Sequence, residues 1–138
     1  MTTKSSGFSL IELLVVVAIL GILSAVGVVS YQGYISGTKQ KSAENAMQQI
    51  SLAQTEEYSN SGEYHIQTES DTCIPDIDTS NDIETVLFGG GDVISEETGY
   101  YMCISKPDDA SYIVIASNKD KGGDKTITMT ANGVWGEL

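Results

Sequence analysis

One acidic residue, Glu12, lies near the start of an otherwise uncharged apolar run that extends from Phe8 to Val29. An ionised carboxylate in a membrane-spanning helix costs roughly 2.5–3.5 kcal/mol at the helix centre and less near an end, so such an acid usually has a function. The run is 22 residues long, and a helix of that length reaches roughly 33 Å, enough to cross the hydrocarbon core. The sequence therefore predicts a membrane-spanning helix whose single charge needs a partner.

The residue before this run, Gly7, is the kind of small residue at which signal sequences are cleaved. In an ordinary secretory signal the small residue follows the apolar region, whereas Gly7 precedes it. Cleavage after Gly7 would remove residues 1–7, leave the apolar helix on the mature chain and create an α-ammonium group on Phe8. That ammonium group is a candidate partner for Glu12, four residues further on.

The segment from Gly7 to Leu13 reads Gly-Phe-Ser-Leu-Ile-Glu-Leu and resembles the class III signal junction of type IV pilins and type II secretion pseudopilins. The resemblance extends through Val17–Leu23, and Tyr31–Tyr34 is similar to the segment with which pilin helices leave the membrane. Many pilins carry a proline two residues before that tyrosine, where this chain has Val29, with Gly27 nearby. Local melting of the helix is less strongly encoded here, because Gly weakens a helix by ~1 kcal/mol and Pro by ~3 kcal/mol.

The resemblance implies that a prepilin peptidase cleaves between Gly7 and Phe8 and methylates the new amine. Glu12 would then neutralise the Phe8 ammonium of a neighbouring subunit. An ion pair formed only between subunits would set their register during assembly, because burying either charge alone is expensive. The alternative is a single-pass anchor whose Glu12 reaches up to the membrane interface.

The same resemblance implies cellular partners and a location. The precursor would reside in the bacterial inner membrane, and the assembled subunit in an extracellular pilus. The chain would polymerise with copies of itself, while an assembly platform and an ATPase motor would be separate proteins.

The rest of the chain is strongly acidic. Seven lysines and no arginine stand against 19 acidic residues, which gives a formal net charge of −12. Such a surface repels polyanions, so direct nucleic-acid binding is unlikely. The one basic loop carries Lys119, Lys121 and Lys125, interleaved with two aspartates. The lone His65 has no recognisable nucleophile near it in sequence, so we predict neither an enzyme nor a bound cofactor.

Residues 36–59 continue the helix and make it amphipathic. Its small and apolar residues recur at spacings of three and four, on one face: Ala43, Ala46, Met47, Ile50 and Ala53. Gly62 suits the left-handed position past a helix end. The sequence therefore predicts one helix of roughly 50 residues, whose second half offers an apolar stripe to a sheet.

Three short segments rich in β-branched and aromatic residues are predicted strands: residues 100–105, 111–117 and 126–131. Their short connections favour an antiparallel meander, which must bury one face and can do so against the helical stripe. Residues 63–98 form a long acidic connection with a short helix or strand near residues 82–88. Trp135 is expected to close the edge of the core, with a contact role as the less favoured alternative.

These elements give an α+β fold with three parts. Residues 1–7 are a cleaved leader, residues 8–35 a hydrophobic helix for membrane insertion and assembly, and residues 36–138 a globular domain that includes the amphipathic half of the helix. This is the organisation that the resemblance to pilins also implies.

Cys73 and Cys103 are the only cysteines. A domain exported across the inner membrane enters an oxidising compartment, so we interpret them as one disulfide. Closing a loop of this length would stabilise the fold by roughly 3–4 kcal/mol. Two free thiols, or metal ligation together with His65, are the alternatives.

The alternation of Asp76, Asp78, Ser80 and Asp82 matches the first ligand positions of an EF-hand. The required glycine and the bidentate glutamate of that motif are absent, so this is not an EF-hand and we predict no metal site. A weak extracellular calcium site in this loop stays open beside a simply solvated loop.

The favoured function is a structural subunit of a type IV pilus. A minor tip pilin with an adhesive or DNA-uptake role is the alternative of a different class, and a type II secretion pseudopilin is the neighbouring structural alternative. The cysteine pair favours a pilin, since major pseudopilins commonly lack a disulfide.

Overall fold

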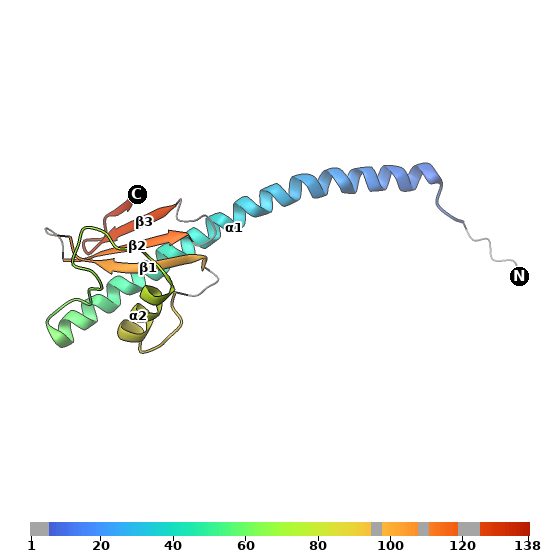
Figure 1. Cartoon of the computed structure of the whole chain (residues 1–138). Helices are drawn as coiled ribbons and strands as arrows, with labels where there is room; N and C mark the ends of the chain where they lie inside the picture. Colours follow the sequence, from blue (N-terminus) through green and yellow to red (C-terminus); the bar gives the residue numbers. More distant parts are fainter. Residues whose placement is uncertain (1–5, 95–97, 108–110, 119–124) are drawn as a thin grey trace, which may run out of the picture. The chain divides into compact units, whose positions relative to one another are not determined.

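A computed structural model of the chain describes residues 6–94, 98–107, 111–118 and 125–138. It contains two helices, α1 (Leu10–Ser61) and α2 (Ile77–Phe88), and four strands within the described residues: β1 (Tyr100–Ser105), β2 (Ile113–Asn118), β3 (Thr126–Thr130) and β4 (Trp135–Glu137) (Figure 1). The predicted α+β fold, a long N-terminal helix with a small antiparallel sheet, is confirmed.

The chain divides into two compact units, Met1–Gly37 and Thr38–Leu138, and α1 contributes to both. We call residues 10–37 the N-terminal segment and residues 38–138 the head. The basic-loop residues Lys119 and Lys121 lie outside the described residues.

Helix α1 is 52 residues long, close to the predicted length. It ends at Ser61, and the next residue, Gly62, has a φ of +82°, in the left-handed region that glycine tolerates. Within the head its buried residues are Ala43, Ala46, Met47, Ile50 and Gln54. Four of these belong to the predicted stripe. The fifth is Gln54 rather than Ala53, because the Gln54 amide donates to the His65 carbonyl (2.7 Å) and accepts from the His65 N–H (2.8 Å).

The sheet is an antiparallel meander in the order β1-β2-β3-β4. The predicted second strand begins two residues too early, and the predicted third strand ends one residue too late. The strand β4 was not predicted. Gly133, with φ +77°, makes the turn that folds β4 back onto β3. Trp135 therefore lies on an edge strand, opposite the buried Met129, with 40% of its surface exposed, and its role in closing the edge of the core stays a prediction.

The core of the head lies between one face of the sheet and the buried stripe of α1. Alternate strand residues face it, among them Met102 and Ile104 from β1 and Val114 and Ala116 from β2. Ile83 of α2 packs into the same cluster. The free edge of β1 is bridged by Thr68, which pairs with Ser105 in parallel. The long connection between α1 and β1 is thus held to the rest of the head at two residues, Thr68 and Ile83.

Of the four alternating residues of the calcium alternative, Asp78, Ser80 and Asp82 belong to α2 and Asp76 precedes it. Helix α2 is longer than the helix or strand predicted near residues 82–88. Asp76 caps this helix: its carboxylate accepts from the Thr79 N–H (2.8 Å), and that bond holds the Asp76 pKa below its usual value. Alternate residues of a helix are about 200° apart around its axis, so these side chains diverge. Among the described residues, no three His, Cys, Asp or Glu side chains are grouped so that they could hold a metal ion.

Candidate functional site

The start of α1 brings Ser9 and Glu12 together. The Glu12 carboxylate oxygen Oε2 accepts from the Ser9 backbone N–H (2.8 Å) and from the Ser9 hydroxyl (2.9 Å). The Glu12 N–H lies 3.3 Å from the Ser9 hydroxyl oxygen and donates to it. This reciprocal arrangement is a capping box, which satisfies backbone N–H groups that a helix leaves without partners at its first turn.

The capping box changes the interpretation of Glu12. From its sequence context the Glu12 carboxylate is a charge that needs an external partner, yet Ser9 of the same chain supplies two hydrogen bonds to it. The positive end of the helix dipole also favours an acid in the first turn. Ser9 is therefore a site residue that the sequence analysis missed, although Ser-x-x-Glu before an apolar run is a recognisable signal for a helix start.

Gly7 and Phe8 precede the helix and are exposed. A Cβ added to Gly7 would meet nothing within 4 Å, and Phe8 has 90% of its surface accessible. The Gly7–Phe8 peptide bond therefore lies in an accessible segment outside regular structure. Nothing within the described chain requires glycine at position 7, so a requirement for it would come from a processing enzyme.

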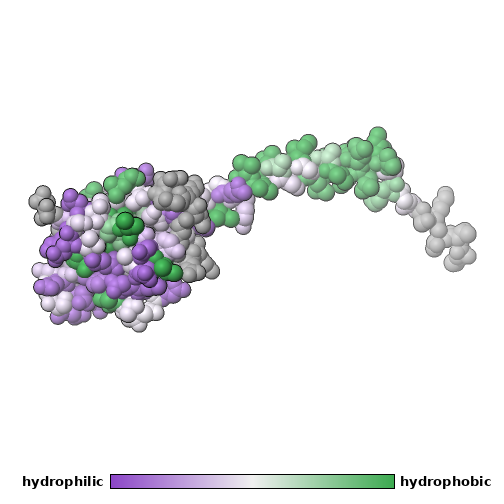
Figure 2. All heavy atoms as spheres, in the orientation of Figure 1, coloured by the Kyte–Doolittle hydropathy of each residue, from purple (hydrophilic) through white to green (hydrophobic). Residues whose placement is uncertain are grey.

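The apolar side chains of the N-terminal segment have no cover within the described residues. Every residue from Leu10 to Tyr34 is exposed, and Figure 2 shows hydrophobic side chains covering the visible face of this stretch. By length and composition, α1 is the one helix among the described residues that could cross a membrane. Exposure of so much apolar surface to water is unfavourable, so lipid or other apolar helices must cover it.

Cys73 and Cys103 form a disulfide, with their Cα atoms 6.2 Å apart. Cys103 is fully buried in β1, on the face of the strand opposite Met102 and Ile104. The bond ties the segment before α2 to the sheet. The alternatives of free thiols and of metal ligation with His65 are therefore not what the structure shows.

His65 instead contacts Asp82 of α2. Its Nε2 lies 2.8 Å from the Asp82 carboxylate, which also accepts from the Gln67 amide (2.8 Å). These hydrogen bonds, that of Gln67 above all, lower the pKa of Asp82 despite its partial burial. The backbone of His65 contacts Gln54 of α1, and its side chain contacts Asp82 of α2. His65 thus links the two helices, which is a structural role.

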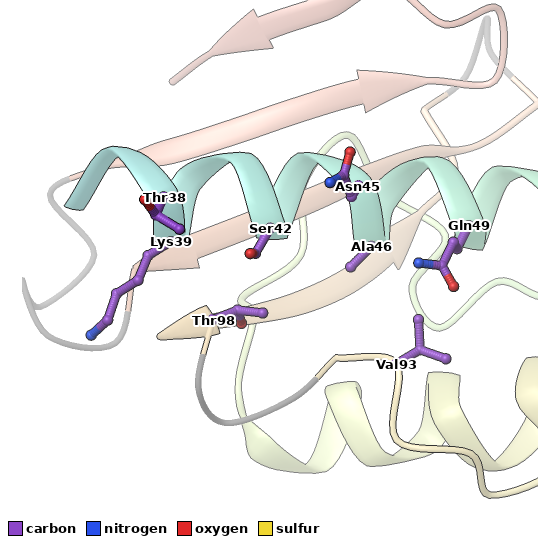
Figure 3. Close-up of a pocket in the computed structure, with 8 residues that line it drawn as sticks. All are labelled: Thr38, Lys39, Ser42, Asn45, Ala46, Gln49, Val93 and Thr98. Atoms are coloured by element: carbon purple, nitrogen blue, oxygen red, sulfur yellow. The ribbon is translucent and has the colours of Figure 1, made fainter. Parts of the chain in front are cut away.

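A polar groove of about 410 Å³ lies on the head beside α1. Six residues of α1 line one side, and Val93 and Thr98 lie opposite them (Figure 3). Its described lining holds hydroxyl, amide and methyl groups and one lysine, Lys39, but no carboxylate, histidine or cysteine. The groove can offer hydrogen bonds, but its described residues provide no pair of groups for acid–base or nucleophilic catalysis.

Comparison with known proteins starts at the N-terminus. A family model described as the prokaryotic N-terminal methylation motif matches residues 2–28, which include Gly7, Phe8 and Glu12. The chain thus carries a prokaryotic N-terminal methylation motif over these residues. No solved structure matches the chain significantly.

Three curated relatives match a longer stretch of the chain, 56 to 64 residues. A fimbrial protein of Neisseria meningitidis serogroup B is 42% identical over 64 residues, which cover 46% of this chain and 38% of that protein. The type IV major pilin protein PilE1 of Neisseria gonorrhoeae is 41% identical over 64 residues, covering 46% and 39%. The fimbrial protein EcpC of Eikenella corrodens is 41% identical over 56 residues, covering 41% and 37%.

These matches span about two fifths of the length of the relatives. The relatives are named as pilins and fimbrial proteins, which are structural proteins and not enzymes. Together with the methylation motif they confirm the resemblance of this chain to type IV pilins.

Proposed function

We propose that the chain is a structural subunit of an extracellular type IV pilus. In this proposal it enters the inner membrane as a precursor, a prepilin peptidase cleaves it after Gly7 and methylates the Phe8 amine, and the N-terminal segment then polymerises. An assembly platform and an ATPase motor act on it as separate proteins. The observation that carries the proposal is an uncovered apolar helix that begins with a capped acid inside a methylation motif.

The exposed N-terminal segment supports polymerisation through helix packing. Lipid tails and the side chains of neighbouring helices are about equally apolar, so moving this segment from a bilayer into a filament core costs little hydrophobic free energy. Its glycines, at positions 21, 27, 33 and 37, have open space where a Cβ would be. Small residues of this kind let helix backbones approach closely in an apolar surrounding.

The capping box supports a specific role for Glu12. The Ser9 N–H that bonds Glu12 belongs to the Phe8–Ser9 peptide, on the mature side of the cleavage site. Cleavage therefore leaves the cap in place. Both bonds from Ser9 use Oε2, and we assign the second oxygen, Oε1, as the acceptor for the Phe8 ammonium of a neighbouring subunit.

The relatives bear on the alternatives. They are named as fimbrial proteins and as type IV major pilins, which favours the main subunit of a surface filament over a secretion pseudopilin. A minor tip pilin with an adhesive or DNA-uptake role would share the same N-terminus and differ in abundance.

Electron microscopy of sheared surface fibres, with mass spectrometry of their subunit, tests this proposal. We expect fibres composed mainly of this chain, with a methylated Phe8 at its N-terminus. Correctly processed chain at trace abundance would point to a minor pilin. Processed chain that remains in the periplasm would point to a pseudopilin, and an unprocessed chain would overturn the proposal.

Substitution at the junction sharpens the test. Gly7→Leu should leave the seven leader residues on the chain, because the bulky side chain would obstruct the peptidase while meeting nothing within the described chain. Gly27→Leu is the matched control, since it makes the same change in similarly open space away from the junction. Its N-terminus should be processed normally, and normal processing of Gly7→Leu would remove Gly7 from the site.

A further inference from the structure

The head carries the whole net charge of the chain and distributes it unevenly. Residues 1–37 contain one lysine, Lys4, and one acid, Glu12, which cancel, so the −12 of the chain belongs to the head. Heads of equal charge repel one another at contact distances, where salt screens little. A filament of such heads therefore needs local attraction wherever two heads touch.

An acidic cleft lies at the end of the head where α1 terminates. We call it the distal cleft; it has a volume of about 1070 Å³. Three carboxylates line it, Glu57, Glu63 and Glu69, against one lysine, Lys106. Half-exposed Tyr58 stacks on Tyr64 in the same cleft, with ring centroids 4.6 Å apart.

This combination fits a cationic side chain. Carboxylates attract an ammonium group, and an exposed tyrosine face adds cation–π attraction. Tyrosine is also enriched at the centres of protein interfaces. Tyr64 in turn contacts Tyr112, whose hydroxyl lies 2.9 Å from that of Ser51, so these contacts link the aromatic pair to α1.

Three other lysines, Lys39, Lys41 and Lys125, lie at the opposite end of the head. Lys39 and Lys41 are in the first turns of α1 within the head, and Lys125 donates to Gln40 beside them. We call these three residues the basic end. Lys41 and Glu57 are 16 residues apart on α1, which separates them by roughly 24 Å along the helix. The sheet lies between the two ends, as α1 runs along it (Figure 1).

We propose that the distal cleft docks the basic end of a second copy of this chain. The inference rests on the proposed function, since it describes how heads contact one another in the filament. The charge pattern makes the contact heterologous: one end of a head meets the other end of its neighbour, which allows open-ended growth. Lys41 suits this role because its side chain is 75% exposed although it also pairs with Glu44.

Charge exchange in the full-length chain tests the contact. Glu57→Lys with Glu63→Lys, or Lys41→Glu with Lys125→Glu, should each lower fibre yield about tenfold, because like charges then face each other. Combining all four substitutions should restore the yield. Glu56→Lys is the matched control, since Glu56 is exposed on the same helix and does not line the cleft; it should assemble normally.

Carbodiimide cross-linking of wild-type fibres gives an independent measurement. We expect mass spectrometry to find amide bonds from Lys41 or Lys125 to Glu57, Glu63 or Glu69 of another copy. The docking proposal would be overturned if wild-type fibres lack these links and the charge-reversed variants form fibres as well as wild type does. The proposed function would still stand in that case. If the wild-type chain forms no fibres at all, the proposed function itself fails.

Discussion

The two halves of α1 are one continuous helix with opposite surroundings. In the head, Ala43, Met47 and Ile50 are fully buried against the sheet. In the N-terminal segment, residues of equal or greater hydrophobicity, such as Ile22 and Leu23, are more than 60% exposed. The half of α1 in the head is therefore covered within one chain, whereas the half in the N-terminal segment has no cover among the described residues.

This difference separates folding from assembly. Burial within the head stabilises the monomer, because the hydrophobic effect acts wherever apolar surface leaves water. The N-terminal segment contributes nothing of this kind to the fold of one chain. Substitutions in the head should therefore change stability, whereas substitutions in the N-terminal segment should change membrane behaviour and assembly.

The largest effect is expected at Glu12. Glu12→Val should leave the chain in the membrane and lower fibre yield on the order of a hundredfold or more, since breaking a buried ion pair costs about 3–5 kcal/mol. Glu12→Gln separates the two roles of the residue, because glutamine can form the same capping box without a charge. If Glu12→Gln fails as Glu12→Val does, the charge is essential. Normal fibres from both variants, counted by electron microscopy, would contradict the intersubunit pair.

The core substitution Ile50→Ala has a matched partner in the N-terminal segment, Ile22→Ala. Ile50 is fully buried, so its truncation should lower the free energy of unfolding of the head by about 2–5 kcal/mol. Ile22→Ala should leave that free energy unchanged. Urea denaturation of the full chain in detergent, followed by near-ultraviolet circular dichroism, measures both. Equal effects would mean that the two halves of α1 are not energetically distinct.

The contrast between the halves also explains what the sequence could predict. The stripe at Ala43 to Ile50 has a strong helical period, and the segments of β1 and β2 are rich in aromatic or β-branched residues, so both kinds of element were predicted. The strand β4 is only three residues long and contains Gly136, so it lacks such a signal. Gln54 is buried by contacts with the His65 backbone, eleven residues away in sequence, which no local pattern reveals.

The candidate site has a local sequence signal for a different reason. Gly7, Phe8 and Glu12 belong to a short linear motif, and its resemblance to pilin signal junctions is what singles them out. The missing member, Ser9, also had a local signal, but that signal concerns helix capping rather than charge pairing. The distal cleft had none, because it combines the end of α1 with Glu69, Lys106 and Ser111, which are distant along the chain.

Reduction of the disulfide should act on the head alone. The bond joins residues 30 positions apart, so its loss should lower the free energy of unfolding by about 3–4 kcal/mol in the chain-entropy account. Cys73→Ala with Cys103→Ala should reproduce the effect of a reductant on wild type, and the reductant should then have no further effect. The helicity of the N-terminal segment in detergent should not change. An equal urea midpoint with and without reductant would show that the bond does not stabilise the head.

The smallest expected effect is a pH dependence at Asp82, which joins α2 to the segment after α1. Hydrogen bonds from Gln67 and His65 lower the Asp82 pKa below its ordinary value of 3.8. A lowered pKa in the folded state means that the carboxylate stabilises the fold above pH 3.8, and that this contribution is lost as the pH falls through the lowered pKa.

Because the Asp82 side chain is 47% exposed, water and salt screen much of this interaction, and the shift in melting temperature should be small. We expect the melting temperature of Asp82→Asn to fall less steeply than that of wild type as the pH is lowered from about 6 to about 3. Asp71→Asn, at an exposed position outside α2, is the control and should keep the wild-type slope. An unchanged slope in Asp82→Asn would mean that the anchor between α2 and the segment after α1 does not depend on this charge, and that packing of Ile83 holds α2 in place.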